Sequence, residues 1–260
     1  MSRKLQMIGI MLVILISISC GGSMPTDTLT PGEVGDIWVR PADGMEMVFV
    51  PGGEFQMGSN DGDDNEKPVH TVTVSDFYIG KYEVTQKEWR DIMGNNPSSF
   101  KGDNLPVEKV SWNDIQKFIK KLNTKTGLNY RLPTDAEWEY AARGGNKSKG
   151  YKYSGSNNID DVAWYRDNSG KKTHSVGSKK ANELGIYDMS GNVREWCNDR
   201  YGSYSSNSQT NPIGASSGSY RVYRGGSYAY YANSCRVANR SDYPDSRSFH
   251  IGFRLLRSSK

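Results

Sequence analysis

Histidine and cysteine side chains are the first candidates for chemistry in this 260-residue chain, which contains three of each. The histidines have no carboxylate or cysteine partner close in sequence and no metal-binding spacing. The cysteines are too few for a disulfide framework, and they lack the paired spacing of a zinc site. These residues therefore predict no catalytic set of their own. They are His70, His174, His250, Cys20, Cys197 and Cys235.

An acidic run between residues 60 and 66 is a further candidate for a metal site. It contains Asp61, Asp63, Asp64 and Glu66, but no glutamate follows at the spacing that a calcium loop needs. We therefore expect a solvated acidic loop without a bound ion.

The segment 228–250 has the composition of a binding loop. It is rich in Tyr, Ser, Asp and Asn, and it lacks Met, Trp, Gln, Lys and Glu. Tyrosine offers a large and stiff contact area, and the short polar side chains offer adaptable hydrogen bonds, as in antibody loops. The five absent types are also those that randomised adenines in an AAC codon cannot encode. The segment therefore predicts a diversified surface for ligand contact.

We call residues 228–250 the variable segment. Short stretches that interrupt its runs of small polar and aromatic residues are called its fixed words. They are Cys235 to Ala238, Arg240, Pro244 and Arg247. The residues between and around them are predicted to contact a ligand, and the competing interpretation is an ordinary set of core and surface aromatics. The predicted contact residues are Tyr228, Ala229, Tyr230, Tyr231, Asn233, Ser234, Asn239, Ser241, Asp242, Tyr243, Asp245, Ser246, Ser248, Phe249 and His250.

Composition excludes several classes of protein. The chain has 33 basic and 29 acidic residues, a near-neutral balance that argues against nucleic acid as a partner. Beyond the N-terminus no apolar run approaches the length of a membrane span. We expect one folded domain over residues 37–260.

The N-terminus has the pattern of an export signal. Arg3 and Lys4 precede an apolar stretch, and small residues lead to Cys20. This order resembles a bacterial lipobox, although Ser17 stands where leucine is usual. We therefore expect a signal peptide over residues 1–19 and a flexible tether over residues 20–36. A lipid on Cys20 would anchor the protein to the bacterial envelope, at the outer membrane or the cell surface.

Three helix starts can be identified in the domain. Thr85, Ser111 and Thr134 each precede a helical pattern, and Thr85 and Thr134 each have a glutamate three residues later. Gly127 is placed to end the second helix, and the third runs into two consecutive glycines. Regular periodicity fades after residue 146, so the fold must tolerate long ordered loops.

Seven sequence words, in this order, resemble the sulfatase-modifying, formylglycine-generating-enzyme-like domain, a subtype of the C-type lectin fold. The variable segment resembles that of the treponemal variable proteins, lipoproteins of this fold diversified by a diversity-generating retroelement. The words are YEVT at 82–85, VSW at 110–112, RLPTDAEWEYAARGG at 131–145, GIYDMSGNVREW at 185–196, RGGSY at 224–228, CRVANR at 235–240 and IGFR at 251–254.

The resemblance implies an α+β domain with small antiparallel sheets, few helices and much ordered loop. It implies that the first and last strands pair. It also accounts for arginines in apolar words, because a buried guanidinium needs carboxylate or carbonyl partners. Arg131, Arg224 and Arg254 are therefore expected to hold the scaffold together.

Activity does not follow from the resemblance. Formylglycine-generating enzymes use two cysteines that bind copper(I), and soft thiolates suit that ion. Only Cys235 lies in the corresponding stretch of this chain, so we expect no oxidase activity. Cys197 and Cys235 leave two alternatives open, a disulfide, which an exported protein permits, or two buried free thiols.

Calcium is a second metal that the resemblance raises. Asn192 and Glu195 match residues of a calcium loop in the family, whereas Arg194 places a positive charge beside that position. The alternative is a turn in which these side chains accept hydrogen bonds from backbone N–H groups. We expect this alternative, and therefore no cofactor.

We therefore expect a non-catalytic, surface-anchored lipoprotein that displays a hypervariable binding site for a macromolecular ligand, protein or glycan. Two other classes remain as alternatives: a formylglycine-generating-type copper oxidase and a structural envelope lipoprotein.

Overall fold

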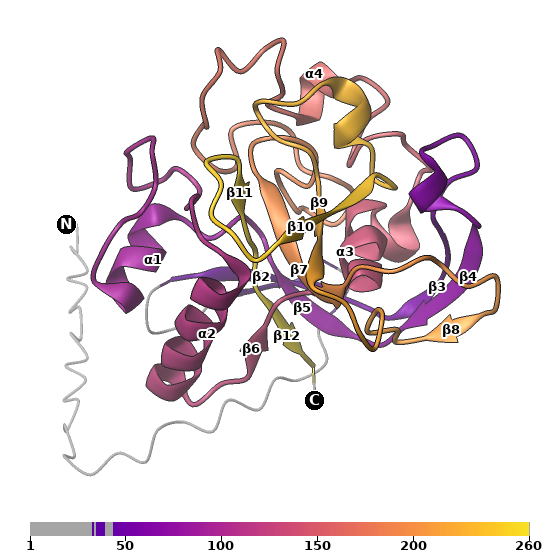
Figure 1. The fold of residues 1–260 in the computed structure, drawn as a ribbon, viewed down its shortest axis with the longest axis horizontal. Coiled ribbons are helices and arrows are strands. Elements are labelled where there is room, and N and C mark those ends of the chain that lie inside the picture. Colours follow the sequence, from indigo (N-terminus) through magenta and orange to yellow (C-terminus); the bar gives the residue numbers. More distant parts are fainter. Residues whose placement is uncertain (1–32, 34, 40–43, 260) are drawn as a thin grey trace, which may run out of the picture. The chain divides into compact units, whose positions relative to one another are not determined.

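Three small sheets and a few short helices make up the described part of this computed structural model, residues 33, 35–39 and 44–259 (Figure 1). The predicted signal peptide, Cys20 and nearly all of the predicted tether lie outside these residues. The strands are β1 (Ile37–Val39), β2 (Glu46–Val50), β3 (Gly53–Met57), β4 (His70–Val74), β5 (Phe77–Gly80), β6 (Tyr130–Arg131), β7 (Arg194–Arg200), β8 (Gln209–Thr210), β9 (Tyr220–Arg224), β10 (Arg240–Pro244), β11 (Ile251–Gly252) and β12 (Leu256–Ser258).

The helices are short, and the α-helices other than α4 begin where the sequence predicts. Thr85, Ser111 and Thr134 are their N-cap residues, and each forms a reciprocal capping box with the third residue of its helix. Gly127 ends α2 in the left-handed conformation, which glycine adopts without steric cost. The helices are α1 (Gln86–Met93), α2 (Trp112–Thr126), α3 (Asp135–Ala142), α4 (Ile159–Val162) and the 3₁₀ turns η1 (Asp64–Glu66), η2 (Gly145–Lys147) and η3 (Ala232–Cys235).

The strand orders confirm an α+β domain but correct one detail of it. The five-stranded sheet has the order β1-β2-β5-β12-β6, so β5 lies between β2 and the last strand, β12. The expected pairing of first and last strands is therefore wrong, although both belong to the same sheet. The second sheet has the order β10-β9-β7-β11, and the third has the order β3-β4-β8.

Helix α3 lies at the centre of the main core. All eight of its residues are buried, because strands from different sheets surround it. Trp138 and Tyr140 pack with Val48, Ile79 and Val222 from β2, β5 and β9. Burial on every side explains why the helix lacks the single apolar face of a surface helix.

Ion pairs join the buried arginines to this core. Arg224 contacts Glu139 at 2.9 Å, and Arg254 contacts Glu195 at 2.6 Å, which confirms the scaffold role expected for these two arginines. Arg131 also forms an ion pair, with Glu137, but its side chain is 36% exposed, so it lies at the edge of the scaffold.

The acidic run differs from its prediction at one residue. Asp61, Asp63 and Asp64 are exposed as expected, whereas Glu66 is fully buried. Its carboxylate accepts two hydrogen bonds from Arg236, so an ion pair compensates the burial.

Within the described residues, no helix is both long enough and apolar enough to span a bilayer.

Candidate ligand-binding surface

The sheet β10-β9-β7-β11 positions much of the variable segment. Ser241 pairs with Tyr223, and Tyr243 pairs with Arg221, so these four side chains lie on one face of the sheet. Asp242 is one position away and therefore lies on the opposite face. The prediction that Asp242 shares a surface with its neighbours is wrong, because side chains alternate along a strand.

Two buried arginines attach the middle of the variable segment to the core beneath this surface. Arg224 donates hydrogen bonds to the carbonyls of Val237, Ala238 and Asn239, which follow η3. Arg240 reaches Asp135 of α3 at 3.0 Å. The backbone of the variable segment is thus attached to the core at its fixed words.

A second attachment joins the end of the segment to α2. Asp245 accepts hydrogen bonds from the backbone and the side chain of Asn113, in the first turn of the helix. Arg247 pairs with Asp114 at 2.7 Å, and this pair is more exposed, with 64% of the arginine side chain accessible. Asp245 therefore helps to hold the loop, in addition to any contact that it makes with a ligand.

A cation lies between two tyrosine rings at the middle of the surface. The guanidinium carbon of Arg194 is 4.4 Å from the ring centroid of Tyr223 and 3.9 Å from that of Tyr230. Tyr243 packs against Tyr223, and His250 packs against Tyr230, with ring centroids 6.0 and 5.1 Å apart. These contacts link residues of β7, β9, β10 and the loop before β11 into one aromatic strip.

His250 closes one end of this strip. Its Nε2 atom lies 3.2 Å from the hydroxyl of Tyr230, and its Nδ1 atom lies 3.0 Å from the hydroxyl of Ser248. Burial and the nearby charge of Arg194 lower the pKa of His250 to about 4. The imidazole is therefore neutral at physiological pH.

A hollow of about 420 Å³ lies beside the strip, because Phe249 in its lining packs against His250. Three aromatic rings and two cationic side chains dominate its lining. Arg166 also stacks on the Tyr231 ring, with its guanidinium carbon 4.3 Å from the ring centroid. The lining residues are Ser99, Phe100, Arg166, Lys171, Tyr228, Ala229 and Phe249.

Most of the predicted contact residues reach the surface. Tyr231 and Phe249 are 58% and 53% exposed, although large aromatic side chains usually avoid water. The predicted residues with exposed or partly exposed side chains are Ala229, Tyr230, Tyr231, Asn233, Ser234, Ser241, Asp242, Tyr243, Asp245, Ser246, Phe249 and His250.

Tyr228, Asn239 and Ser248 are buried, which corrects the prediction that they form exposed contacts. Tyr228 packs edge-on against Phe100 and donates to the carbonyl of Phe249, although its ring still lines the hollow. Burial, followed by the charge of Glu108, raises the pKa of Tyr228 to about 12. Asn239 donates to Asp63 and Glu66, and Ser248 bonds to His250, so both satisfy polar groups of the protein itself.

The structure also divides the exposed set. Asn233 accepts a hydrogen bond from Arg236, which pairs with Glu66 of η1, so Asn233 belongs to that contact. The aromatic strip and the hollow instead gather residues from the two ends of the variable segment. The predicted set is therefore not one continuous surface.

Several residues of the surface lie outside the predicted segment. Phe100, Arg166 and Lys171 come from loops without periodicity, and nothing in the sequence connects them to residues 228–250. Arg194 and Tyr223 are in strands, and only the strand pairing brings them to the aromatic strip. One feature of the sequence could have pointed to Arg194, because it is the only basic residue in the word at 185–196.

The two cysteines of the described domain are free and buried in separate clusters. Cys197 packs in the main core with Trp138, and Cys235 packs with Tyr153 and Tyr165. Of the two alternatives, the structure therefore has free thiols. Burial raises the pKa of Cys235 to about 12 and raises that of Cys197 well above its ordinary value, which disfavours the thiolate form.

Asn192 and Glu195 have partners of their own. The amide of Asn192 donates to Glu83 at 2.6 Å and accepts from the backbone of His174 at 3.0 Å. Both carboxylate oxygens of Glu195 accept from Arg254, and one also accepts from Trp138. These groups do not fit a calcium ion, because the Arg254 charge occupies the carboxylate that the ion would need. Among the described residues, no three His, Cys, Asp or Glu side chains gather in a metal-binding cluster.

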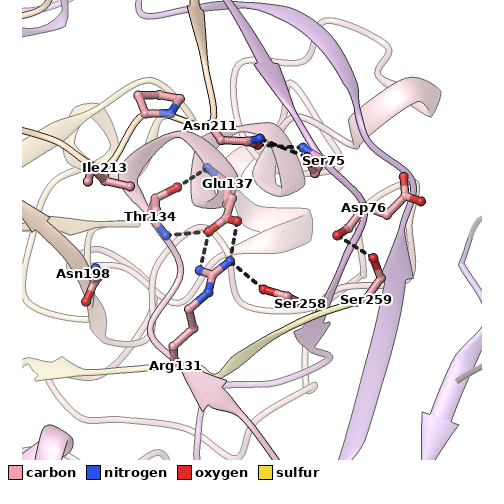
Figure 2. Close-up of a pocket in the computed structure, with 11 residues that line it drawn as sticks. Ser75, Asp76, Arg131, Thr134, Glu137, Asn198, Asn211, Ile213, Ser258 and Ser259 are labelled. Atoms are coloured by element: carbon pink, nitrogen blue, oxygen red, sulfur yellow. Dashed lines mark hydrogen bonds and ion pairs between the residues drawn. The ribbon is translucent and has the colours of Figure 1, made fainter. Parts of the chain in front are cut away.

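A second hollow, of about 590 Å³, is lined by none of the residues of the variable segment. Figure 2 shows that its polar groups mostly bond to one another. Arg131 and Glu137 form a bidentate pair, and Asn211 bonds to Ser75. Glu137 is thus engaged with Arg131 and with the backbone N–H of Thr134.

Comparisons with known proteins agree with this architecture. Residues 35–259 match the Sulfatase-modifying factor enzyme 1-like domain family. The formylglycine-generating enzyme of Streptomyces coelicolor is 31% identical in an alignment 310 positions long, and the alignment covers 90% of this chain and 95% of the enzyme. The chaperone protein LppX of Paenibacillus barcinonensis is 45% identical in an alignment 202 positions long, which covers 58% of this chain and 70% of that protein.

Two solved structures are similar over most of the chain. Treponema denticola variable protein 1 has a TM-score of 0.80 and 33% identity, covering 86% of this chain and 98% of its own. PvdO from Pseudomonas aeruginosa has a TM-score of 0.74 and 27% identity, covering 87% and 99%. The chain therefore belongs to the sulfatase-modifying factor enzyme 1-like family, and its domain has the formylglycine-generating-enzyme type of C-type lectin fold.

Proposed function

We propose that this protein is a non-catalytic display protein, anchored to the bacterial envelope, whose exposed residues between 228 and 250 bind a macromolecular ligand and can be exchanged without loss of the fold. The similarity to a variable protein of the same fold supports this proposal. The ligand is a protein or a glycan, and nucleic acid is not expected because the chain is near neutral.

The observation that carries the proposal is that the central fixed words are buried, whereas aromatic residues on either side of them in the sequence are exposed. Arg236, Val237, Ala238 and Arg240 are between 3% and 7% exposed. Tyr231 and Phe249, on either side of them in the sequence, are each more than half exposed. A surface whose backbone is held by buried residues can exchange its exposed side chains with little loss of stability, because surface substitutions away from special contacts are nearly neutral.

The thiols support the absence of oxidase chemistry. Copper(I) needs two thiolates on one ion, whereas Cys197 and Cys235 lie in separate clusters and their burial favours the protonated form. The relatives named as formylglycine-generating enzymes make a copper oxidase the rival function, and its test is turnover of a cysteine-containing sulfatase peptide in the presence of copper(I).

The proposal is tested with two libraries of the full chain. The first randomises four exposed or partly exposed positions outside the aromatic strip, namely Ala229, Tyr231, Ser246 and Phe249. The control library randomises the same number of buried fixed positions, namely Arg236, Val237, Ala238 and Arg240. Each library is displayed, sorted for cooperative unfolding, and selected against a panel of unrelated immobilised proteins and glycans.

The exposed library should stay folded, with melting temperatures shifted by only about 2 °C per substitution, and it should yield different binders for different targets. The control library should lose cooperative unfolding. Equal loss of folding in both libraries, or binders whose enrichment does not depend on the target, would contradict the proposed function.

The anchor has a separate test. The wild-type chain expressed in a bacterium with lipoprotein processing should incorporate a labelled fatty acid and partition into a detergent phase. Cys20→Ala should lose both properties while Cys197→Ala retains them. Labelling that persists in Cys20→Ala would contradict the proposed anchor.

A further inference from the structure

Arg194 differs from every other buried arginine of the described residues in having no carboxylate partner. Five arginines are buried, and Arg194 is 5% exposed. Arg224, Arg236, Arg240 and Arg254 each form an ion pair with a buried aspartate or glutamate. No ion pair of the described chain includes Arg194, although a buried charge without a counter-ion is costly.

The surroundings of Arg194 compensate this cost only in part. The guanidinium lies over the rings of both Tyr223 and Tyr230, and cation–π contacts of this kind each contribute about 1 kcal/mol. The Nε atom is enclosed and has no hydrogen-bond partner. Neither terminal nitrogen of the guanidinium forms a hydrogen bond or an ion pair within the described residues, so the edge between these two nitrogens is left for a carboxylate.

Two more unpaired cations lie at the hollow beside the strip. The backbone N–H of Arg166 donates to the carbonyl of Tyr230 at 3.0 Å, which holds the backbone of Arg166 beside that of the residue whose ring contacts Arg194. Arg166 and Lys171 line the hollow, and neither forms an ion pair within the described residues. The lining between them is apolar, with the rings of Phe100 and Phe249 prominent.

We infer that the site binds acidic protein segments, in which an aspartate or glutamate carboxylate reaches Arg194 and a neighbouring apolar side chain enters the hollow. This inference rests on the proposed function. A planar guanidinium matches a carboxylate in two parallel hydrogen bonds. The apolar lining favours a peptide side chain over a sugar, which needs many polar partners.

A consequence concerns diversification. Arg166, Lys171 and Arg194 all lie outside residues 228–250, so exchange of the variable residues leaves these charges in place. The framework thereby sets a common preference for acidic partners, and the exchangeable side chains set the fit to each one.

The test pans a random peptide library, displayed on phage, against the full-length wild-type chain and three variants. Arg194→Met removes the buried charge while filling a similar volume between the two rings. Arg166→Gln with Lys171→Gln removes the exposed cations without touching the core. Arg247→Met is the matched control, because it removes an exposed arginine of the variable segment that does not line the hollow.

Peptides enriched on the wild type should carry Asp or Glu next to an apolar residue. Each should lose about tenfold or more in affinity when its acid is replaced by the corresponding amide, as expected for a hydrogen-bonded buried charge. Arg194→Met and the double variant should lose this discrimination, and Arg247→Met should retain it. The melting temperature of Arg194→Met should not fall, because an uncompensated charge has been removed.

Equal acidic enrichment on Arg194→Met and on wild type would overturn the inference. A drop in the melting temperature of Arg194→Met as large as that of Arg236→Met would also overturn it, because Arg194 would then be part of the scaffold. Enrichment of peptides without acids, or of glycans alone, would do the same. Failure here with success of the exposed-position library would reject only the acidic preference, whereas failure of that library would reject the proposed function itself.

Discussion

Arg236 and Glu66 are 170 positions apart in the sequence and form a bidentate ion pair, with nitrogen–oxygen distances of 2.6 and 2.8 Å. The pair attaches the variable segment to η1 at a place where both side chains are buried. Burial alone would raise the pKa of Glu66, but the hydrogen bonds and charge of Arg236 outweigh it and lower the pKa. The pair is therefore one of the fixed points on which the exposed loops depend.

Replacing Glu66 should destabilise the domain strongly. Glu66→Gln leaves the buried Arg236 without its counter-ion, and we expect a loss of about 3 kcal/mol or more in the free energy of unfolding. Urea denaturation at neutral pH measures this loss. Asp64→Asn is the control, because the neighbouring Asp64–Lys67 pair is exposed and should contribute little.

The same pair predicts a dependence on pH. Because the pKa of Glu66 is lowered on folding, its contribution to stability is present above the ordinary carboxyl range and is lost as the pH falls through the folded-state pKa. Glu66→Gln should therefore reduce the difference in stability between neutral and acidic pH. An unchanged difference would show that the pair does not stabilise the fold.

Asp199 should have the opposite dependence on pH. Its carboxyl is buried beside Asp135, which Arg224 and Arg240 keep ionised, and burial followed by this like charge raises the pKa of Asp199 to about 8. The folded state then holds a proton that the unfolded state releases, so stability is greatest below the ordinary aspartate pKa and declines as the pH rises toward 8.

Asp199→Asn should remove this decline, since the amide has no proton to lose. At pH 7 we expect the variant to be about 1–3 kcal/mol more stable than the wild type, and at pH 4 nearly equal to it. Thermal unfolding across this pH range measures both values. A variant that is less stable at every pH would indicate that the hydrogen bond from the backbone of Asp135 matters more than the charge.

His250 should report the charge of Arg194. Burial and that charge lower the pKa of His250 to about 4, while its ring bonds to Tyr230 and Ser248. Arg194→Met should raise the pKa toward the ordinary histidine value, and an NMR titration of the imidazole would measure the change. Tyr231→Phe is the control, because Tyr231 contacts Arg166 and not this group.

The lowered pKa of His250 also makes the stability of the fold depend on pH. Its contribution is complete above the ordinary histidine pKa and is lost as the pH falls toward about 4, because the unfolded state takes up the proton first. A pKa near 6.5 in the wild-type protein would contradict the enclosed position of the ring.

The two buried thiols should react slowly in the folded protein. In the full chain carrying Cys20→Ala, a thiol reagent should modify Cys197 and Cys235 only on unfolding in urea, because both thiols are enclosed and their pKa values are raised. Rapid modification at neutral pH, or copper(I) retention that Cys235→Ser abolishes, would instead support an oxidase-type site.

Local signals in the sequence were enough to predict the helix starts, the fold and the position of the variable segment. Capping boxes at Thr85, Ser111 and Thr134 span only three residues each, so the helix starts could be predicted without the rest of the chain. The ordered family words determined the fold, and the biased composition of residues 228–250 singled out the segment that carries most of the exposed aromatic side chains.

Only the tertiary structure decided which of those side chains are exposed and what lies beside them. Tyr228, Asn239 and Ser248 have the same residue types as their exposed neighbours, but the chain path encloses them. The hollow gathers residues from several loops, and the stacking of Arg194 depends on strands distant in sequence. Burial and charge pairing depend on segments that meet only after folding, so composition and spacing alone do not contain them.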